Sequence, residues 1–257
     1  MREPSPALTL LETSNLSIRE RATSVTAGIW WSSPGYRDAD INAIVGRVVP
    51  ISNAAMRASA VATEAFLVAS ADAAGVETSA GMIDVSMETV RGVSAEEVYG
   101  RLGPTVWGGL SRGMTVDEAV TMGAQRLAKV IETNIQLART HTSRDVMKRQ
   151  DGIVGYQRVP SGKNPCALCL LASTQRYHYD TLMPIHPGCQ CTVEAIYGKQ
   201  DPGQIIDGET LDQVNAQIAE RFGTKYERKD LAAMNDLVVV RSHGELGPVL
   251  EFAGKAA

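Results

Sequence analysis

The sequence predicts an α+β protein, with a helical N-terminal half over residues 1–150 and a small α+β module over residues 151–257. Aromatic residues make up only 5% of the chain, and alanine, valine, leucine and methionine are plentiful up to residue 150, a composition typical of helices. After Gly152 the chain changes to short β-prone runs punctuated by proline and glycine. With 257 residues and 44% hydrophobic content, the chain can bury the core of one large or two modest domains.

The first long periodic segment runs from Asp38 to about Ala74. Its apolar residues recur at helical spacing, while Pro50 interrupts the pattern. This predicts one kinked helix or two helices in succession, with Gly75 as the stop signal. No period is sustained between residues 77 and 92, so a loop is expected there.

Two capping sequences predict further helix starts in this half. Ser94 to Glu97 has the Ser-x-x-Glu form, in which the hydroxyl and the carboxylate each satisfy a free backbone N–H. Thr115 to Glu118 repeats this form and opens the longest helix, with acids at its start and bases near its end, as the helix dipole favours. The apolar stripe of that helix consists of Val116, Val120, Leu127, Ile131, Ile135 and Ala138.

Short strands and one more helix are predicted in the C-terminal module. Residues 153–159 and 192–197 have the composition of strands. A third capping sequence at 210–213 predicts a helix that Gly223 closes, and residues 237–241 predict a final short strand. The module is therefore expected to end in a short helix and a strand.

Charge and hydropathy restrict the possible partners. The net charge of −4 gives no general electrostatic basis for nucleic-acid binding, although Arg158, Lys163 and Arg176 could make local phosphate contacts. No run of roughly 18 apolar residues occurs, as a membrane-spanning helix would need. The apolar stretch at residues 7–11 is too short for the core of a secretion signal, so a soluble protein made in the cytoplasm is expected.

All four cysteines fall within a span of 26 residues, which also contains His186. The order is Cys166-x2-Cys169, sixteen intervening residues, then His186-x2-Cys189-x-Cys191. A Cys-x-x-Cys turn supplies two thiolates from one bend, and the His-Pro-Gly-Cys turn with the following Cys191 can supply a second pair. Five candidates compete for the four places of a tetrahedral zinc ion. Either four thiolates bind with His186 outside them, or three thiolates bind with His186.

A structural zinc ion explains this spacing better than the alternatives. Two disulfides would require an oxidising compartment, and four ordinary buried thiols would not need such clustering. A segment rich in proline and glycine buries little apolar surface, whereas structural zinc contributes on the order of 10 kcal/mol to folding. His178 is expected to lie outside the site. Residues 165–169 match half of a deaminase signature, but the required upstream His-x-Glu is absent, since Thr142 and Ser143 follow His141.

Three stretches of this segment together resemble the signature of MuF-like minor head proteins of tailed phages, commonly of actinobacterial hosts. They are residues 166–169, 173–177 and 182–191, and residues 243–250 resemble a further stretch of that group. The resemblance implies a structural component present in few copies near the portal, which helps head assembly and accompanies the genome on ejection. It implies portal, shell or scaffold proteins as partners, packaged DNA as a further candidate, and a location first in the host cytoplasm and then in the virion head.

Two other functions stay open at this point. Related phage genes at this position are described as capsid maturation proteases, which need a nucleophile and a base. No Gly-x-Ser-x-Gly or His-Glu-x-x-His motif is present, which disfavours proteolysis. The available side chains are Ser24, Ser52, Ser111, Ser143, Ser173, His141 and His243. A zinc module that contacts DNA is the third possibility.

Overall fold

The computed structural model describes residues 5–79, 81–161, 167–173, 176–186, 189–198, 212, 216, 219, 238–243 and 247–252. Contacts divide the chain into two units. The helical unit comprises residues 13–62 and 83–141, and the cysteine unit comprises residues 1–12, 63–82 and 142–257. The change from helices to strands falls between Lys148 and Ile153, close to residue 150, while a domain boundary at that place stays a prediction.

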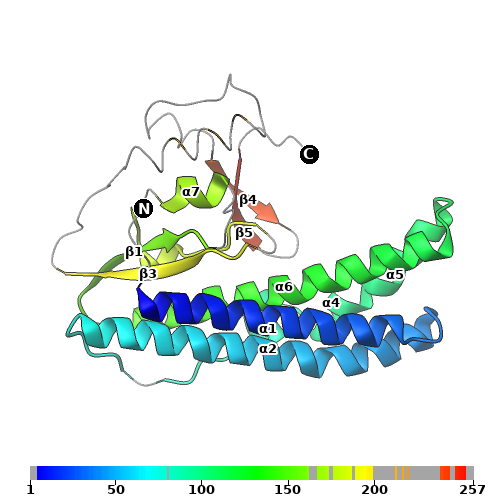
Figure 1. Ribbon diagram of the computed structural model, residues 1–257, viewed down its shortest axis with the longest axis horizontal. Helices are drawn as coiled ribbons and strands as arrows, with labels where there is room; N and C mark the ends of the chain where they lie inside the picture. The colour runs from blue at the N-terminus through cyan, green and yellow to red at the C-terminus, as the bar shows by residue number, and fades with distance from the viewer. Residues whose placement is uncertain are drawn as a thin grey trace. The chain divides into compact units, whose positions relative to one another are not determined.

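The predicted α+β class is confirmed (Figure 1). Up to Lys148, the described chain forms helices α1 to α6. Their bounds are α1 Pro6–Trp31, α2 Asp38–Ala73, α3 Met87–Arg91, α4 Ala95–Gly100, α5 Leu102–Ser111 and α6 Val116–Lys148. The segment after Asp38 is one helix that continues through Pro50. It ends where predicted, because Gly75 adopts a left-handed φ of 69° and the Val76 N–H donates to the Ala71 carbonyl.

The expectation of a loop throughout residues 77–92 was wrong, because α3 forms within it. Ser86 caps this five-residue helix by accepting a hydrogen bond from the Thr89 N–H, at 3.2 Å. Gly92 closes it with a φ of 73°. Such a helix is shorter than the window over which apolar periodicity can be seen, so only its caps mark it in the sequence.

The two capping sequences differ in the structure. Ser94 accepts from the Glu97 N–H at 3.2 Å, but the Glu97 carboxylate pairs with Arg101. Thr115 and Glu118 form both bonds of the capping box. The Thr115 N–H donates to the Glu118 carboxylate at 2.9 Å, and the Glu118 N–H donates to the Thr115 hydroxyl at 3.3 Å. These bonds hold the pKa of Glu118 below its ordinary value.

Replacing Thr115 with Ala should destabilise the helical unit by about 1 kcal/mol, the usual cost of losing a Ser or Thr cap. Because the pKa of Glu118 is lowered on folding, its contribution is present above the unfolded pKa and is lost as the pH falls through the folded one. The difference between wild type and Thr115→Ala should therefore shrink in acid. Urea unfolding at neutral pH and at about pH 3 would measure this, and a pH-independent difference would contradict it.

The core of the helical unit surrounds Trp30, which is fully buried. Its indole N–H donates to the Val120 carbonyl of α6 at 3.2 Å, and its ring lies 4.8 Å from the ring of Tyr36. The predicted stripe of α6 belongs to this core except for Val116, which is 63% exposed. The members that pack in the core are Val120, Leu127, Ile131, Ile135 and Ala138. The stripe therefore forms the protein's own interior.

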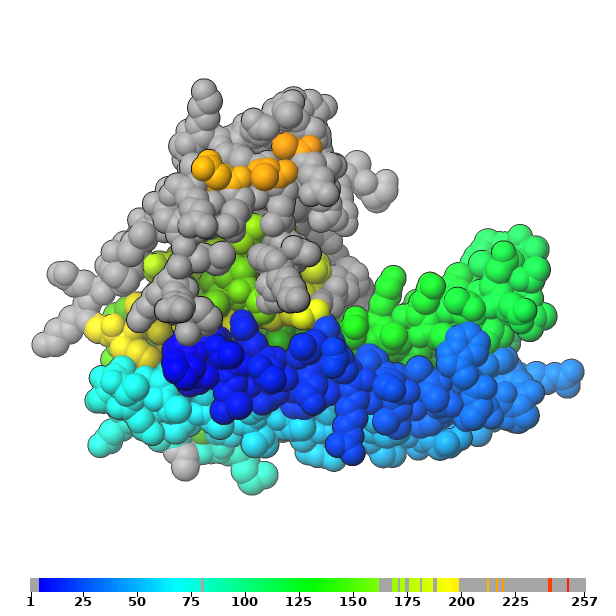
Figure 2. All heavy atoms as spheres, in the orientation of Figure 1, coloured from blue at the N-terminus to red at the C-terminus, as the bar shows by residue number. Residues whose placement is uncertain are grey.

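Buried polar side chains also join the helices of this unit. The Asn134 amide donates to the Ser52 hydroxyl at 3.1 Å and to the Tyr99 hydroxyl at 2.9 Å, and it accepts from Arg91 at 2.7 Å. Burial raises the pKa of Tyr99 to about 12. Within the same unit α1 and α2 lie side by side, and Figure 2 shows their side chains in contact along the visible face. Satisfied polar networks of this kind fix the register of packed helices.

The cysteine unit contains a three-stranded antiparallel sheet in the order β2-β1-β3. Strands β1 (Ile153–Val159) and β3 (Thr192–Tyr197) have the predicted bounds, and β2 (Arg176–Tyr177) was not predicted. Helix α7 (Ala167–Ser173) and the 3₁₀ turn η1 (Tyr179–Thr181) lie between β1 and β3 in sequence. The strand predicted at residues 237–241 is β4 (Val238–His243), and its partner β5 (Gly247–Phe252) was not predicted. Of the helix predicted from residue 210, the structure describes Asp212, Ala216 and Ala219, which are helical.

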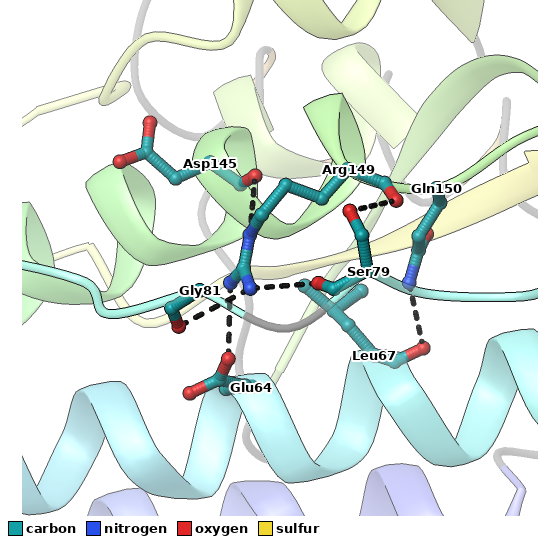
Figure 3. Close-up of polar contacts among 7 residues, drawn as sticks. All are labelled: Glu64, Leu67, Ser79, Gly81, Asp145, Arg149 and Gln150. Carbon is teal, nitrogen blue, oxygen red and sulfur yellow. Dashed lines mark hydrogen bonds and ion pairs between the residues drawn. The ribbon is translucent and has the colours of Figure 1, made fainter.

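The end of α6 is tied to its surroundings within the cysteine unit (Figure 3). The Arg149 guanidinium donates to the carbonyls of Ser79 and Gly81 at 3.0 and 3.2 Å, and pairs with the Glu64 carboxylate at 3.0 Å. The next residue, Gln150, donates to the Leu67 carbonyl and accepts from the Tyr197 hydroxyl of β3. These contacts fix the point where the chain leaves α6 for the sheet.

None of the helices among the described residues is apolar over the length needed to cross a bilayer.

Replacing Arg149 with Met should destabilise the cysteine unit by about 2 kcal/mol, because the Ser79 and Gly81 carbonyls and the Glu64 carboxylate lose a charged donor. The matched control is the neighbouring Lys148→Met. The Lys148 ammonium lies 3.7 Å from Asp180 in a largely exposed pair, which should contribute less than about 1 kcal/mol. Denaturant unfolding of both variants would test this, and equal effects would show that the Arg149 contacts are not stabilising.

Candidate metal centre

Three thiols converge in the cysteine unit. Cys169 belongs to α7, and Cys189 and Cys191 immediately precede β3. The Cys169 and Cys189 sulfurs are 3.2 Å apart, as are those of Cys189 and Cys191, and all three lie within 4.8 Å of one another. Cys169 and Cys189 are buried and Cys191 is half-buried. None of these three sulfurs is in a disulfide bond, so the disulfide alternative does not describe them.

Local structure brings Cys189 to this place. Its backbone N–H donates to the His186 carbonyl at 3.1 Å, the i to i+3 bond typical of a β-turn. The proline and glycine between His186 and Cys189 in the sequence favour such a turn. Cys191 follows two residues later and enters β3, so that both sulfurs come from one short segment while Cys169 comes from another.

The structure brings together three of the five predicted ligands. Cys166 lies outside the described residues, and His186 is half-buried but does not belong to the group of three sulfurs. His178 also lies outside the group, as predicted. Its ring stacks on Tyr179 at 4.4 Å and its Nδ1 lies 3.5 Å from the Asp180 carboxylate. The fourth ligand of the proposed zinc ion can therefore be either Cys166 or His186, as the two ligand sets suggested by the sequence require.

The cluster has the chemistry of a site for a borderline-soft divalent cation. Zn–S bonds of about 2.3 Å place the sulfurs of a tetrahedral site about 3.8 Å apart, so sulfurs now 3.2 Å apart would separate by about 0.6 Å on binding the ion. Among the described residues, one buried cluster beside the sheet consists of Met147, Tyr156, Leu182 and Val193. A bound metal would add its binding free energy to the stability that such packing provides. Three close cysteines in this position could hold such an ion.

Arg158 is the residue near the cluster whose role the sequence did not indicate. It was a candidate for phosphate contact, but it is only 5% exposed, so its guanidinium is not available to DNA. Its Nη1 lies 3.9 Å from the Cys191 sulfur, and its Nη2 donates to the Met183 carbonyl. Of the other two candidate bases, Arg176 is half-buried and Lys163 lies outside the described residues. The hypothesis that the cysteine unit contacts DNA is therefore left with two of its three candidate phosphate contacts.

Two tyrosine rings lie beside the Arg158 guanidinium. The rings of Tyr156 and Tyr177 stack at 5.2 Å, and each ring centroid lies 5.8 Å from the guanidinium carbon. Burial acts to lower the pKa of Arg158, but Cys191 and the two tyrosines act in the opposite direction and hold it above its ordinary value. Burial also raises the pKa of Tyr177 to about 12. The positively charged side chain of Arg158 is thus held on β1 beside the cysteine sulfurs.

Comparison with known proteins identifies the family. No curated protein and no solved structure matches the chain. The family model described as VG15 protein matches residues 5–220, which include the helices and the cysteine segment. That family is a phage gene family. Because the match extends over most of the chain, the protein belongs to the VG15 protein family and is phage-derived.

Proposed function

We propose that this chain is a structural minor head protein of a tailed phage, which acts in head assembly near the portal. The observation that carries the proposal is the VG15 family match together with the resemblance of residues 166–191 to MuF-like minor head proteins. The family match supports a phage gene, and the resemblance supports the more specific role in the head. Portal, shell or scaffold proteins would be its partners, and the virion head its final location.

The proposal includes one structural zinc ion in the cysteine unit. Cys169, Cys189 and Cys191 would supply three ligands, and Cys166 or His186 the fourth. When bound, the ion would hold α7 against the segment that leads into β3. A rigid module of this kind suits a protein whose task is to keep its shape within an assembly.

Proteolysis is not favoured by the contacts of the serines that it would need. The Ser52 hydroxyl is fully buried and hydrogen-bonded to Asn134. The Ser111 and Ser173 hydroxyls donate to helix carbonyls, those of Gly108 and Leu170. Each of these hydroxyls contributes to helix structure, which supports a structural role over a protease.

Particles of the parent phage assembled with and without this gene would test the proposal. We expect a few copies per wild-type particle, fewer completed heads without the gene, and no cleavage of the shell protein that depends on this chain. A variant with Ser173→Ala serves as a control for proteolysis and should assemble normally. Copies at the stoichiometry of the shell, or none in the particle, would contradict the portal-linked role. Cleavage that Ser173→Ala abolishes would establish the protease instead.

A further inference from the structure

We propose that Arg158 is the counter-cation of the thiolate cluster and strengthens metal binding by offsetting its negative charge. The inference rests on the proposed zinc site. It concerns a residue outside the ligand set, and it assigns a function to the most deeply buried charged group of the sheet. Three or four thiolates around a divalent ion carry a net negative charge, which is costly to bury unless a cation lies close by.

The cysteine sulfurs are the groups near Arg158 that can serve as its anionic partners. Arg158 is 5% exposed, and among the described residues no carboxylate lies within ion-pair distance of its guanidinium. The nearest group that can carry negative charge is the Cys191 sulfur, at 3.9 Å. A buried guanidinium without an anion would be strongly destabilising. The contact with the Cys191 sulfur therefore places the buried positive charge of Arg158 beside the proposed ligands.

Three groups hold the Arg158 guanidinium in place. The Met183 carbonyl accepts from Nη2, and the stacked rings of Tyr156 and Tyr177 lie beside it. Because these contacts hold the Arg158 side chain in place without a metal, little side-chain entropy is lost when a metal binds beside it. This arrangement distinguishes Arg158 from a surface arginine that happens to approach a thiol.

The sheet offers a matched control in Arg176. This residue lies on β2 directly opposite Gln157 of β1, whereas Tyr177 lies opposite Tyr156. Side chains alternate between the two faces of a strand, so Arg176 shares the face of Gln157, and Arg158 shares the face of the tyrosines. Replacing Arg176 with Met removes the same charge from the same sheet but from the face opposite to Arg158.

The experiment compares zinc affinity of the full chain in wild type, Arg158→Met, Arg158→Lys and Arg176→Met, by competition with a chromophoric chelator. We expect Arg158→Met to weaken zinc binding about 10- to 100-fold, the usual effect of removing a residue that supports metal ligands. Arg158→Lys keeps the charge and should recover part of this loss, and Arg176→Met should bind as wild type. If Arg158→Met does not fold without metal, Arg158→Lys is compared with wild type in zinc-dependent refolding instead. We expect the zinc affinity of Arg158→Lys to be less than tenfold weaker than that of wild type.

Cobalt substitution separates a charge effect from a change of shape. Sulfur-to-cobalt charge-transfer bands report the number of bound thiolates, and Arg158→Met should show the same bands as wild type at higher cobalt concentration. Fewer thiolates in the variant, or equal zinc affinity of Arg158→Met and wild type, would overturn the role of Arg158 and leave the zinc site standing. A wild-type chain that binds no zinc would overturn both proposals.

Discussion

Removal of zinc from the folded protein is expected to unfold the cysteine unit while leaving the helical unit folded. Structural zinc contributes on the order of 10 kcal/mol to small metal-dependent modules. The cluster of buried residues beside the sheet, which includes Tyr156 and Val193, is not expected to compensate for such a loss. Hydrogen exchange read by mass spectrometry should show fast exchange in β1 and β3 after chelation and unchanged protection around Ile131 of α6.

The triple variant Cys169→Ser, Cys189→Ser and Cys191→Ser should behave like the chelated wild type and should not respond to added zinc. The control is His178→Ala, which changes a possible ligand type close to the site but outside the thiol group. It should retain zinc and normal exchange. If the triple variant keeps the protection of β1 and β3, the thiols do not hold the unit together.

The second large effect is expected at Trp30 of the helical unit. Replacing this fully buried side chain with Ala should cost about 3–5 kcal/mol, because the surrounding helices can only partly close the cavity. The same change removes the hydrogen bond from the indole to the Val120 carbonyl. Chemical denaturation followed by circular dichroism would measure the loss. A cost below about 1 kcal/mol would show that Trp30 is not central to the packing.

Gly123 of α6 provides a sharper test of the same contact. A Cβ at this position would lie 2.5 Å from the Trp30 ring and 2.8 Å from a methyl group of Val106. Gly123→Ala should therefore destabilise by about 1–3 kcal/mol, although alanine is intrinsically the better helix former. In a Trp30→Ala background the contact with the ring is gone and only the one with the Val106 methyl group remains, so Gly123→Ala should cost less there than in wild type.

The control for this difference between backgrounds is Gly28 of α1, where no atom lies within 4 Å of an added Cβ. Gly28→Ala should stabilise in both backgrounds by a similar amount, up to about 1 kcal/mol. A Gly123→Ala variant that is more stable than wild type would mean that the helices pack differently around Trp30. Equal effects in the two backgrounds would show that the two residues are not in contact.

The sequence predicted those parts of the fold that local patterns control. Composition, helical periodicity and side-chain caps predicted the bounds of β1 and β3, the extent of α2 and the start of α6 at the Thr115 capping box. Whether α2 is one helix or two stayed open until the structure showed one. Short elements were missed for a physical reason. Helix α3 is too short to show a period, and β2 has two residues whose strand state depends on pairing with β1.

The candidate site was predictable in its ligand types but not in its surroundings. Cysteine spacing identified the segment, and the structure brings Cys169, Cys189 and Cys191 together. Arg158 could not be recognised from sequence, because a single arginine in a strand is usually exposed. Its burial depends on the tertiary positions of Tyr156 and Tyr177, which come together only when β1 and β2 pair. Val116 likewise fits the helical stripe but lies beyond the core that covers the rest of it.

Zinc K-edge X-ray absorption of protein purified without chelator tests the account most directly. Convergence of cysteines from α7 and from the segment before β3 on one ion predicts about one zinc per chain, with three or four sulfur neighbours at about 2.3 Å. The triple cysteine variant should lack this signal. A normally folded chain without zinc, or zinc surrounded only by nitrogen and oxygen, would contradict the account.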